Sequence, residues 1–226
     1  MRNVKRVQKP ECLRVHSDEW RDSLLQFTDS GSEPPKDLVD NYNRPEVRQA
    51  LERMYSVGDG CYCCYCEKEM DDHESEIEHR KPREVFPQYT FDWGNLHLAC
   101  STCNRNKGQQ WDKRKRNEIL DAAKTRSINN KHLTYEFRAM TGVLRIPVSK
   151  RGETTVYHAD LNRKKLLRGR WKVWIATTEA INRIKSLGRD DPRVRTEMRM
   201  IEEMCLGEYG SVIRWLFDTE MSGWLD

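Results

Sequence analysis

The sequence of 226 residues predicts an α+β fold that is predominantly helical, with a zinc-binding segment embedded between helical N- and C-terminal segments. Three observations predict this class. Six of the eight cysteines fall in two tight clusters, a stretch long enough to form a hairpin separates these clusters, and apolar residues recur at helical spacing on both sides of them. We therefore expect three segments, residues 1–60, 61–115 and 116–226.

The composition describes a strongly solvated chain. Only 37% of the residues are hydrophobic and 34% are charged, so each helix can bury only a narrow stripe. The 40 basic and 36 acidic residues leave a net charge of +4, which alone is a weak indication of a polyanionic partner. No run approaches the roughly 18 apolar residues that a membrane span requires, and the first residues do not resemble a signal peptide. We therefore expect a cytoplasmic protein with no membrane association.

The first segment, residues 1–60, predicts two helices. Ser17 can cap the first helix, in which the apolar residues share one face. Pro45 can open the second helix, because proline fits the first helical turn. Residues 58–60 contain two glycines that can end it.

The second segment, residues 61–115, contains two Cys-x-x-Cys pairs, Cys63/Cys66 and Cys100/Cys103. In a chain without an export signal, close cysteine pairs bind metal more often than they form disulfides. Two such pairs complete a tetrahedral four-sulfur zinc site of the structural kind, which has no open position for chemistry. We expect this Zn²⁺ to hold the fold, so that its binding free energy is part of the folding free energy.

The register of the first pair is open on spacing alone. Cys61 and Cys64 form an overlapping Cys-x-x-Cys pair, and His73 or His97 could replace a sulfur ligand. We prefer the other pair, because its second cysteine leads directly into the motifs described below. On this interpretation Cys61 and Cys64 are small buried residues, and His97, which lies between two leucines, is structural.

The third segment, residues 116–226, predicts further helices and a strand-forming stretch. Helices are expected at residues 117–124, at 173–187, from Asp191-Pro192 onward and at 211–219. Residues 142–147 and 154–157 could form strands or a hairpin, although Pro147 restricts the first of them to a sheet edge.

Four motifs of the second segment carry a family resemblance. They are Cys63-Cys64-Tyr65-Cys66-Glu67, Ile77-Glu78-His79-Arg80-Lys81-Pro82, Phe91-Asp92-Trp93-Gly94-Asn95-Leu96 and Ala99-Cys100-Ser101-Thr102-Cys103-Asn104-Arg105-Asn106-Lys107. Through Glu78-His79, Asn95-Leu96 and Asn104 the sequence resembles the HNH, or ββα-metal, nuclease superfamily. More narrowly, it is similar to the PtuB family of HNH nucleases from Septu anti-phage systems, including those attached to retrons. The resemblance implies a zinc-stapled ββα-metal finger between the helical flanks.

Cleavage of a phosphodiester requires an activated water and a cation on the phosphate oxygens. His79 is the candidate general base, because a neutral imidazole accepts a proton near neutral pH. Glu78 and Asn104 supply hard oxygen ligands, which favour Mg²⁺ or Mn²⁺ at a second, open site. Neighbours on a strand point to opposite faces, so we expect a bent or bulged hairpin to let Glu78 and His79 flank one phosphate. The resemblance implies that Asn95 hydrogen-bonds across the loop and fixes the orientation of the base.

Basic residues follow the last cysteine pair closely. We interpret them as contacts to nucleic-acid phosphates; they are Arg105, Lys107, Lys113, Arg114, Lys115 and Arg116. The alternative for such a run is a solvated helix face. Further along the chain, Asp160-Leu161-Asn162 followed by Leu166-Leu167-Arg168-Gly169-Arg170 is similar to an element that the PtuB family carries downstream.

The resemblance implies partners that the residues alone do not indicate. A PtuA-like ATPase would hold the nuclease inactive until infection and would dock on the helical flanks, above all after Val173. A retron-linked member would add a reverse transcriptase and its DNA product as regulators. The alternative to a nuclease is a non-catalytic, treble-clef-like zinc module that binds nucleic acid or protein through the basic runs. Such a module has no need of Glu78, His79 and Asn104.

Overall fold

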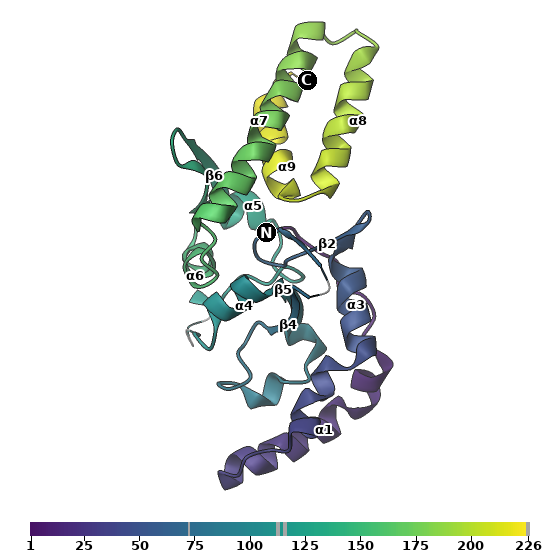
Figure 1. Ribbon diagram of the computed structural model, residues 1–226, viewed down its shortest axis with the longest axis vertical. Helices are drawn as coiled ribbons and strands as arrows, with labels where there is room; N and C mark the ends of the chain where they lie inside the picture. Colours follow the sequence, from purple (N-terminus) through teal and green to yellow (C-terminus); the bar gives the residue numbers. More distant parts are fainter. Residues whose placement is uncertain (72, 112–113, 115–116, 225–226) are drawn as a thin grey trace.

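The computed structural model describes residues 1–71, 73–111, 114 and 117–224. Figure 1 shows the N-terminal helices at one end of the molecule, the helices α7, α8 and α9 at the other, and the short strands β2, β4 and β5 between them. This arrangement confirms the α+β class, with the cysteine-rich segment flanked by helices.

The N-terminal helices are α1 (Glu11–Ser30), α2 (Lys36–Val39), the 3-10 turn η1 (Asp40–Asn43) and α3 (Pro45–Tyr55). The expected start of the first helix at Ser17 is wrong. Pro10 takes the N-cap position instead, and Ser17 lies buried inside α1, where its hydroxyl accepts a hydrogen bond from Lys9. The second helix begins at Pro45 as expected, because the fixed φ of proline suits the first helical turn.

The central segment contains two small antiparallel sheets. The first has the order β1 (Ser56–Val57), β2 (Gly60–Tyr62), β3 (Glu69–Met70), and in the second β4 (Ser75–His79) pairs with β5 (Leu96–Cys100). The helix α4 (Ser101–Lys107) follows β5 directly. The 3-10 turns η2 (Pro87–Tyr89) and η3 (Trp93–Asn95) lie in the connection between β4 and β5. Strand, strand and helix therefore follow in the order expected of a ββα finger.

The C-terminal segment combines a hairpin with long helices. Its elements are α5 (Ile128–Lys131), β6 (Leu133–Arg138), β7 (Gly142–Pro147), α6 (Lys150–His158), α7 (Lys164–Leu187), α8 (Arg193–Leu206) and α9 (Gly210–Met221). The strand expected at residues 142–147 is confirmed as β7. The strand expected at 154–157 is wrong, because these residues belong to α6. Ser149 caps that helix by accepting a hydrogen bond from the N–H of Gly152, which outweighs the β-branched composition.

The helix expected at residues 117–124 is also wrong. The structure describes all of these residues: Asn117 has a 3-10 conformation, and residues 118–124 are irregular or in a turn. Their backbone groups bond to side chains from other segments: the hydroxyl of Thr155 accepts the N–H of Leu120 at 2.9 Å, and Arg80 donates to the carbonyl of Ile119 at 3.0 Å. Such tertiary hydrogen bonds satisfy the backbone in place of a helical ladder.

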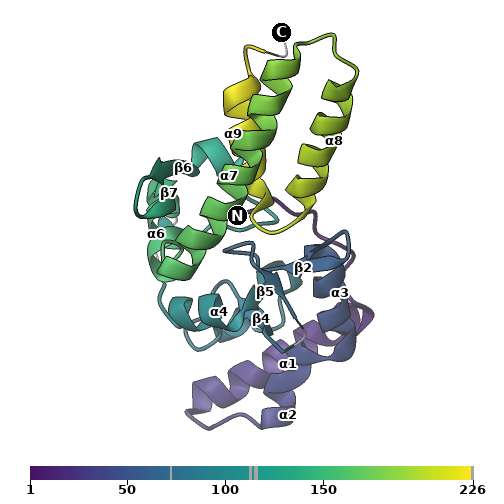
Figure 2. The same ribbon diagram turned by 45° about the horizontal axis from the view of Figure 1, so that its top comes forward.

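The buried apolar side chains of the described residues form two cores. The larger core joins α1, α3, the central segment and the β6–β7 hairpin, and the smaller core lies between α7, α8 and α9. Figure 2 shows these three helices projecting from the rest as a bundle. Among the helices of the described residues, we find none whose length and hydropathy would allow it to cross a membrane.

Candidate active site and metal centre

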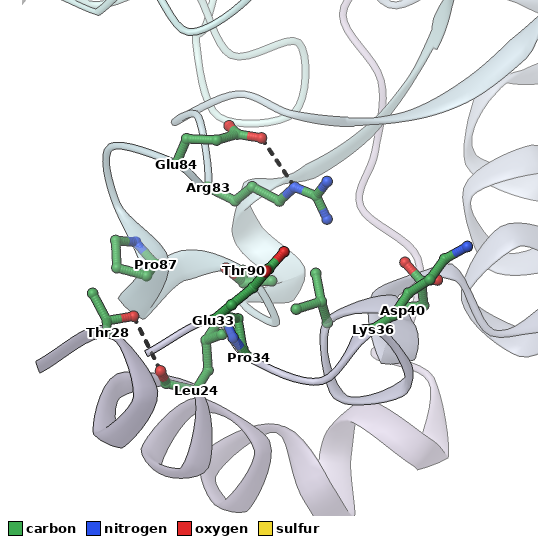
Figure 3. Close-up of a pocket in the computed structure, with 11 residues that line it drawn as sticks. Leu24, Thr28, Glu33, Pro34, Lys36, Asp40, Arg83, Glu84, Pro87 and Thr90 are labelled. Atoms are coloured by element: carbon green, nitrogen blue, oxygen red, sulfur yellow. Dashed lines mark hydrogen bonds and ion pairs between the residues drawn. The ribbon is translucent and has the colours of Figure 1, made fainter. Parts of the chain in front are cut away.

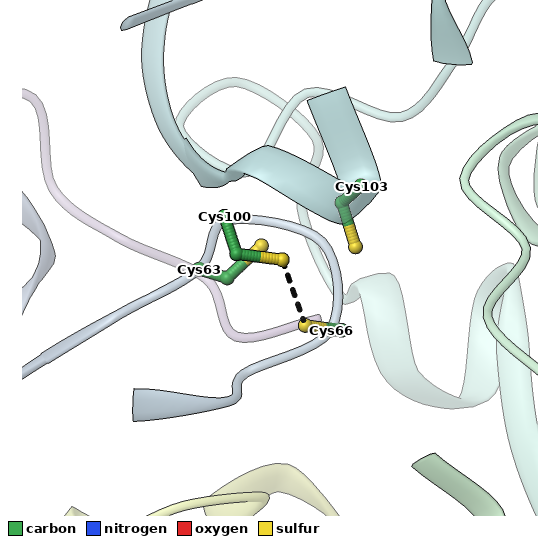
Figure 4. Close-up of side chains that lie close together, drawn as sticks. All are labelled: Cys63, Cys66, Cys100 and Cys103. Atoms are coloured by element: carbon green, nitrogen blue, oxygen red, sulfur yellow. Dashed lines mark hydrogen bonds between the residues drawn. The ribbon is translucent and has the colours of Figure 1, made fainter. Parts of the chain in front are cut away.

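Four cysteine side chains meet where α4 and the end of β5 face the turn after β2. Each of the four sulfur atoms lies within 4.8 Å of the others, and all four side chains are buried. Figure 4 shows the four side chains close together: Cys63, Cys66, Cys100 and Cys103. The Sγ atoms of Cys66 and Cys100 are 3.9 Å apart. Tetrahedral Zn²⁺ with bonds of about 2.3 Å to sulfur requires sulfur separations of about 3.8 Å. The set therefore fits a zinc ion.

The clustering confirms the register with Cys63 and Cys66 and leaves Cys61 and Cys64 outside the sulfur cluster. The turn that carries the first pair is shaped by its backbone. The N–H of Glu67 donates to the carbonyl of Cys63 at 3.1 Å, and Glu67 has a left-handed φ of 63°. The N–H of Cys64 donates to a carbonyl of β5 at 2.9 Å. These bonds hold the turn beside the second cysteine pair.

A guanidinium from the C-terminal segment lies against the sulfur cluster. Nη2 of Arg163 is 3.3 Å from Sγ of Cys103 and 4.0 Å from Sγ of Cys100. Burial acts to lower the pKa of Arg163, but the neighbouring thiolates outweigh it and raise that pKa above its ordinary value. Four thiolates around one Zn²⁺ carry an excess of negative charge, and the guanidinium offsets part of it.

Hydrogen bonds from Asn162 and Arg170 hold the turn that contains Arg163. Both residues belong to the element of residues 160–170 that resembles the PtuB family. The side chain of Asn162 accepts the N–H of Arg145 at 2.8 Å and donates to the carbonyl of the same residue at 2.9 Å. The buried guanidinium of Arg170 donates to the carbonyls of Leu161 at 2.8 Å and Val143 at 2.9 Å. These bonds join the α6–α7 turn to β7, so the C-terminal segment reaches the sulfur cluster on a rigid support.

A polar pocket of about 200 Å³ opens beside the ββα unit. Its lining includes Glu78 and His79 from the end of β4, and Asn104 and Lys107 from α4. The pairing of β4 with β5 is continuous through both β4 residues, so the expected bulge is absent from this described pair of strands. The structure thus places Glu78, His79 and Asn104 in the lining of one cavity, whereas Asn95 is not among its lining residues.

The imidazole of His79 is held on two sides. Its Nε2 lies 3.0 Å from the carbonyl oxygen of Thr90, and its ring packs edge-to-face on Tyr42 with centroids 4.5 Å apart. Because a carbonyl can only accept, Nε2 carries the proton and Nδ1 is the basic nitrogen of the ring. Burial lowers the pKa of His79 to about 4, although the bond to Thr90 opposes this shift. The ring is therefore neutral at pH 7.

The carboxylate of Glu78 is buried and already has two donors. Its Oε1 accepts a hydrogen bond from the hydroxyl of Tyr65 at 2.8 Å and lies 2.9 Å from Nζ of Lys107. Burial raises the pKa of Glu78, and the Lys107 ammonium and the Tyr65 hydroxyl act against that shift. The lysine therefore supplies the positive charge that a buried carboxylate requires.

Lys107 differs from the surface phosphate contact that we expected. Its side chain is only 2% exposed, and Nζ also donates to the carbonyl of His79 at 2.8 Å. Lys107 therefore fastens α4 to the end of β4 from inside the molecule. Of the other basic residues, Arg105 and Arg114 are exposed, whereas Lys113, Lys115 and Arg116 lie outside the described residues.

Asn95 crosslinks the connection between β4 and β5. Its Oδ1 accepts the N–H of Lys81 at 2.8 Å, and its Nδ2 donates to the carbonyls of Lys81 at 3.0 Å and Tyr89 at 3.1 Å. Tyr89 immediately precedes Thr90, whose carbonyl holds the imidazole of His79. The side chain of Asn95 thus lies across the loop, in the position that the resemblance implies.

Asn104 stands on α4 directly after the last cysteine. Its Nδ2 donates to Oε2 of Glu76 at 2.7 Å, which orients the amide. Sequence reasoning missed Glu76, although its spacing of two residues from Glu78 on one strand was a signal that both belong to the same face.

His97 is structural, as expected from its position between two leucines. Its Nδ1 lies 2.5 Å from the hydroxyl of Tyr55, and its Nε2 lies 3.3 Å from Nη2 of Arg6. Burial lowers the pKa of His97 to about 3. The ring is therefore a neutral, hydrogen-bonded part of the core, and it lies outside the sulfur cluster.

Comparison with known proteins agrees with this geometry. Residues 63–110 match the family model for HNH endonuclease. The central segment carries an HNH domain. The chain is also 26% identical to the Septu protein PtuB of Bacillus thuringiensis over 152 residues, which are 66% of this chain and 54% of that protein. It thus spans about half the length of the curated relative that it matches. No solved structure matches the chain significantly.

The HNH domain match contains both cysteine pairs, His79, Asn95 and Asn104 but not Arg163. Sequence reasoning missed Arg163 as well. The signal that could have indicated it was its position directly after Asp160-Leu161-Asn162 in an otherwise basic run. Only the fold shows that this turn lies against the sulfur atoms of the HNH domain.

Proposed function

We propose that the chain is a metal-dependent HNH endonuclease that hydrolyses phosphodiester bonds of nucleic acid. The observation that carries the proposal is the convergence of Glu78, His79 and Asn104 on one polar pocket beside the sulfur cluster. A purely structural zinc module has no need of this second set of side chains. The match to the HNH endonuclease family supports the same reaction class.

His79 is the general base of the proposed reaction. The carbonyl of Thr90 holds the Nε2 proton, so Nδ1 accepts the proton of the attacking water. Tyr42 limits the rotation of the imidazole through their edge-to-face contact. Asn95 is a positioning residue, because it bonds to the carbonyl of Tyr89 and so fixes the peptide that reaches Thr90.

Glu78 and Asn104 are the residues that would hold a divalent cation in the pocket. Carboxylate and amide oxygens are the donors that Mg²⁺ and Mn²⁺ prefer. Such an ion, when bound, polarises the phosphate and neutralises its charge. Glu76 orients the Asn104 amide, and the Lys107 ammonium opposes the rise that burial causes in the pKa of Glu78. Exposed basic residues that follow, including Arg105, would contact neighbouring phosphates.

The similarity to the Septu protein PtuB supports a role in a Septu-type anti-phage defence system. In that role the nuclease would have a PtuA-like ATPase as its companion in the cytoplasm. The projecting bundle of α7, α8 and α9 is the surface that we assign to this companion. In a retron-linked system, a reverse transcriptase and its DNA product would join the complex. Co-purification with an ATPase encoded beside this chain tests the assignment.

The substitution His79→Gln tests the nuclease directly. Glutamine retains an N–H that can donate to the Thr90 carbonyl but has no basic nitrogen. We expect cleavage to fall by at least about 100-fold, the contribution of a general base. The assay uses duplex DNA, single-stranded DNA and RNA in Mg²⁺ or Mn²⁺, with His16→Ala on the exposed face of α1 as the matched control.

Zinc content and melting temperature should stay close to those of the unsubstituted protein, since His79 lies outside the sulfur cluster. Undiminished cleavage by the variant would remove His79 from the mechanism. If the unsubstituted protein binds all three polymers and cuts none of them in either metal, the second candidate function, a non-catalytic zinc module, would replace the nuclease.

A further inference from the structure

A second and larger cavity, of about 580 Å³, adjoins the polar pocket (Figure 3). It lies between α1, the α1–α2 loop with α2, and the loop that connects β4 to β5. The two cavities share Arg83 and Glu84 in their linings, and the Arg83 guanidinium lies 3.2 Å from the Glu84 carboxylate. A group in the larger cavity would therefore be an immediate neighbour of a group in the polar pocket.

The larger cavity is also coupled to the general base. Thr90, whose carbonyl holds Nε2 of His79, belongs to its wall. On the shared side, Arg83 donates to the hydroxyl of Tyr42 at 3.3 Å, and the ring of Tyr42 packs on His79. The contents of this cavity thus border directly on Thr90 and, through the Arg83 side chain, are linked to Tyr42.

The lining suits a flat, neutral, partly apolar group. Leu24, Val39, Pro34 and Pro87 supply apolar surface, and the charged residues of the lining are three carboxylates and two cations. A phosphate group would meet this excess of negative charge, whereas the amino and imino groups of a nucleobase are hydrogen-bond donors to carboxylates. The volume lies within the range of about 300–1,000 Å³ that is usual for small-molecule sites.

We propose that this cavity receives one unpaired nucleobase next to the scissile phosphate. The proposal rests on the nuclease function proposed above and names its substrate class, a single-stranded or looped nucleic acid. The polar pocket takes the phosphodiester, and the adjoining nucleotide places its base between α1 and the β4–β5 loop. A paired base would have to leave its stack first, which costs free energy, so unpaired strands are cut preferentially.

The test combines two changes: protein variants whose cavity is filled, and substrates that lack one base. Val39→Phe and Thr28→Phe add bulk from different walls, and Val15→Phe, on an exposed part of α1, is the matched control. The substrates are a series of single strands that each contain one abasic position. This position is shifted along the series from one side of the cleaved bond to the other. We expect the unsubstituted protein to cut at least about tenfold more slowly when the abasic position adjoins that bond. The variants with a filled cavity should cut the intact strand as slowly as the unsubstituted protein cuts that abasic strand. Their cleavage rate should not fall further when the abasic position adjoins the cleaved bond.

A binding measurement separates this proposal from the nuclease itself. In the His79→Gln background, a strand with 2-aminopurine at the same position should become more fluorescent on binding, because the base leaves its stacked neighbours. Val39→Phe should abolish this rise and Val15→Phe should not. Cleavage that is indifferent to the abasic position, with no fluorescence change, would overturn the base site and leave the nuclease standing. If the fluorescence rises but the unsubstituted protein cleaves no substrate, the base site would be supported and the nuclease refuted.

Discussion

The sulfur cluster and the polar pocket share one turn of α4 but have opposite characters. Cys103 is fully buried and belongs to a closed set of four soft ligands, whereas the next residue, Asn104, is half-buried and lines an open cavity with oxygen and nitrogen donors. The first set has no position left for a substrate, and the second has no thiolate. The difference teaches that one helix can contribute side chains to two sites of different chemistry, because successive residues on it point in different directions.

Each region also contains its own buried or half-buried cation. Arg163 lies against the sulfur atoms of the cluster, and Lys107 lies against the carboxylate of Glu78 in the pocket. In both places a cation offsets negative charge that lies close to it, on the thiolates of the cluster in one case and on the Glu78 carboxylate in the other. The following predictions test whether the two regions are as different in their energetics as they are in their chemistry.

The largest effect is expected from Cys66→Ser. A structural Zn²⁺ contributes on the order of 10 kcal/mol to folding, and three thiols do not complete its tetrahedral site. We expect loss of bound zinc and of the folded central segment, and loss of the polar pocket with it. The measurement is the zinc-to-protein ratio together with circular dichroism and thermal melting.

Cys64→Ser is the matched control for this prediction, because Cys64 is buried in the same turn but lies outside the cluster. It should retain one zinc ion per chain. Full zinc content in Cys66→Ser, or loss of zinc in Cys64→Ser, would show that the ligand set is wrong.

An intermediate effect is expected from Lys107→Met. The substitution leaves Glu78 buried without its cation, and breaking a buried ion pair in this way costs about 3–5 kcal/mol. If Glu78 holds a divalent cation, Mg²⁺ or Mn²⁺ can replace the missing charge. The melting temperature of the zinc-loaded variant should therefore rise more on addition of Mg²⁺ than that of the unsubstituted protein.

Arg105→Met is the control, since it removes an exposed cation from the same helix and should change the free energy of unfolding by no more than about 0.5 kcal/mol. An equal loss of stability in Lys107→Met with and without added Mg²⁺ or Mn²⁺ would indicate that Glu78 is not a ligand of either ion.

The sequence predicted which cysteines form the cluster, and which residues of β4 and α4 line the polar pocket, better than it predicted the structure around them. Cysteine spacing and the order of Glu78-His79, Asn95 and Asn104 are local, so the ββα unit could be recognised before any fold was known. What failed depended on partners that are distant in the chain. Residues 117–124 have helical composition, but their backbone bonds to Arg80 and Thr155, which only the tertiary structure brings there.

The same reason explains the errors at single side chains. Lys107 follows Asn104 closely in a stretch of basic residues, which is typical of an exposed surface. No neighbouring residue in the sequence indicates that Lys107 is buried against Glu78. Ser17 is an exception to this reason, because the competing signal is local: Pro10 lies seven residues earlier and already starts α1. Arg163 is one of many basic residues in its run, and it is distinguished only by the hairpin and helix that carry it to the sulfur atoms.

The smallest effect is expected from Arg163→Ala, which changes the environment of the sulfur cluster without removing a ligand. The guanidinium donates a charge-assisted hydrogen bond to Cys103, so its loss leaves more negative charge on the thiolates uncompensated. Removal of such outer contacts typically weakens metal binding by about 10- to 100-fold. We expect faster zinc transfer from the variant to a coloured chelator, with an unchanged circular dichroism spectrum.

Arg163→Lys should restore part of the zinc affinity because it restores the charge, and Lys164→Ala, on the exposed side of α7, should have no effect. Equal transfer rates for the unsubstituted protein and Arg163→Ala would mean that the guanidinium only joins the C-terminal segment to the cluster. In that case the sulfur cluster would hold its metal without help from a neighbouring cation, whereas the polar pocket would still depend on Lys107. The two regions would then differ more than their similar cations suggest.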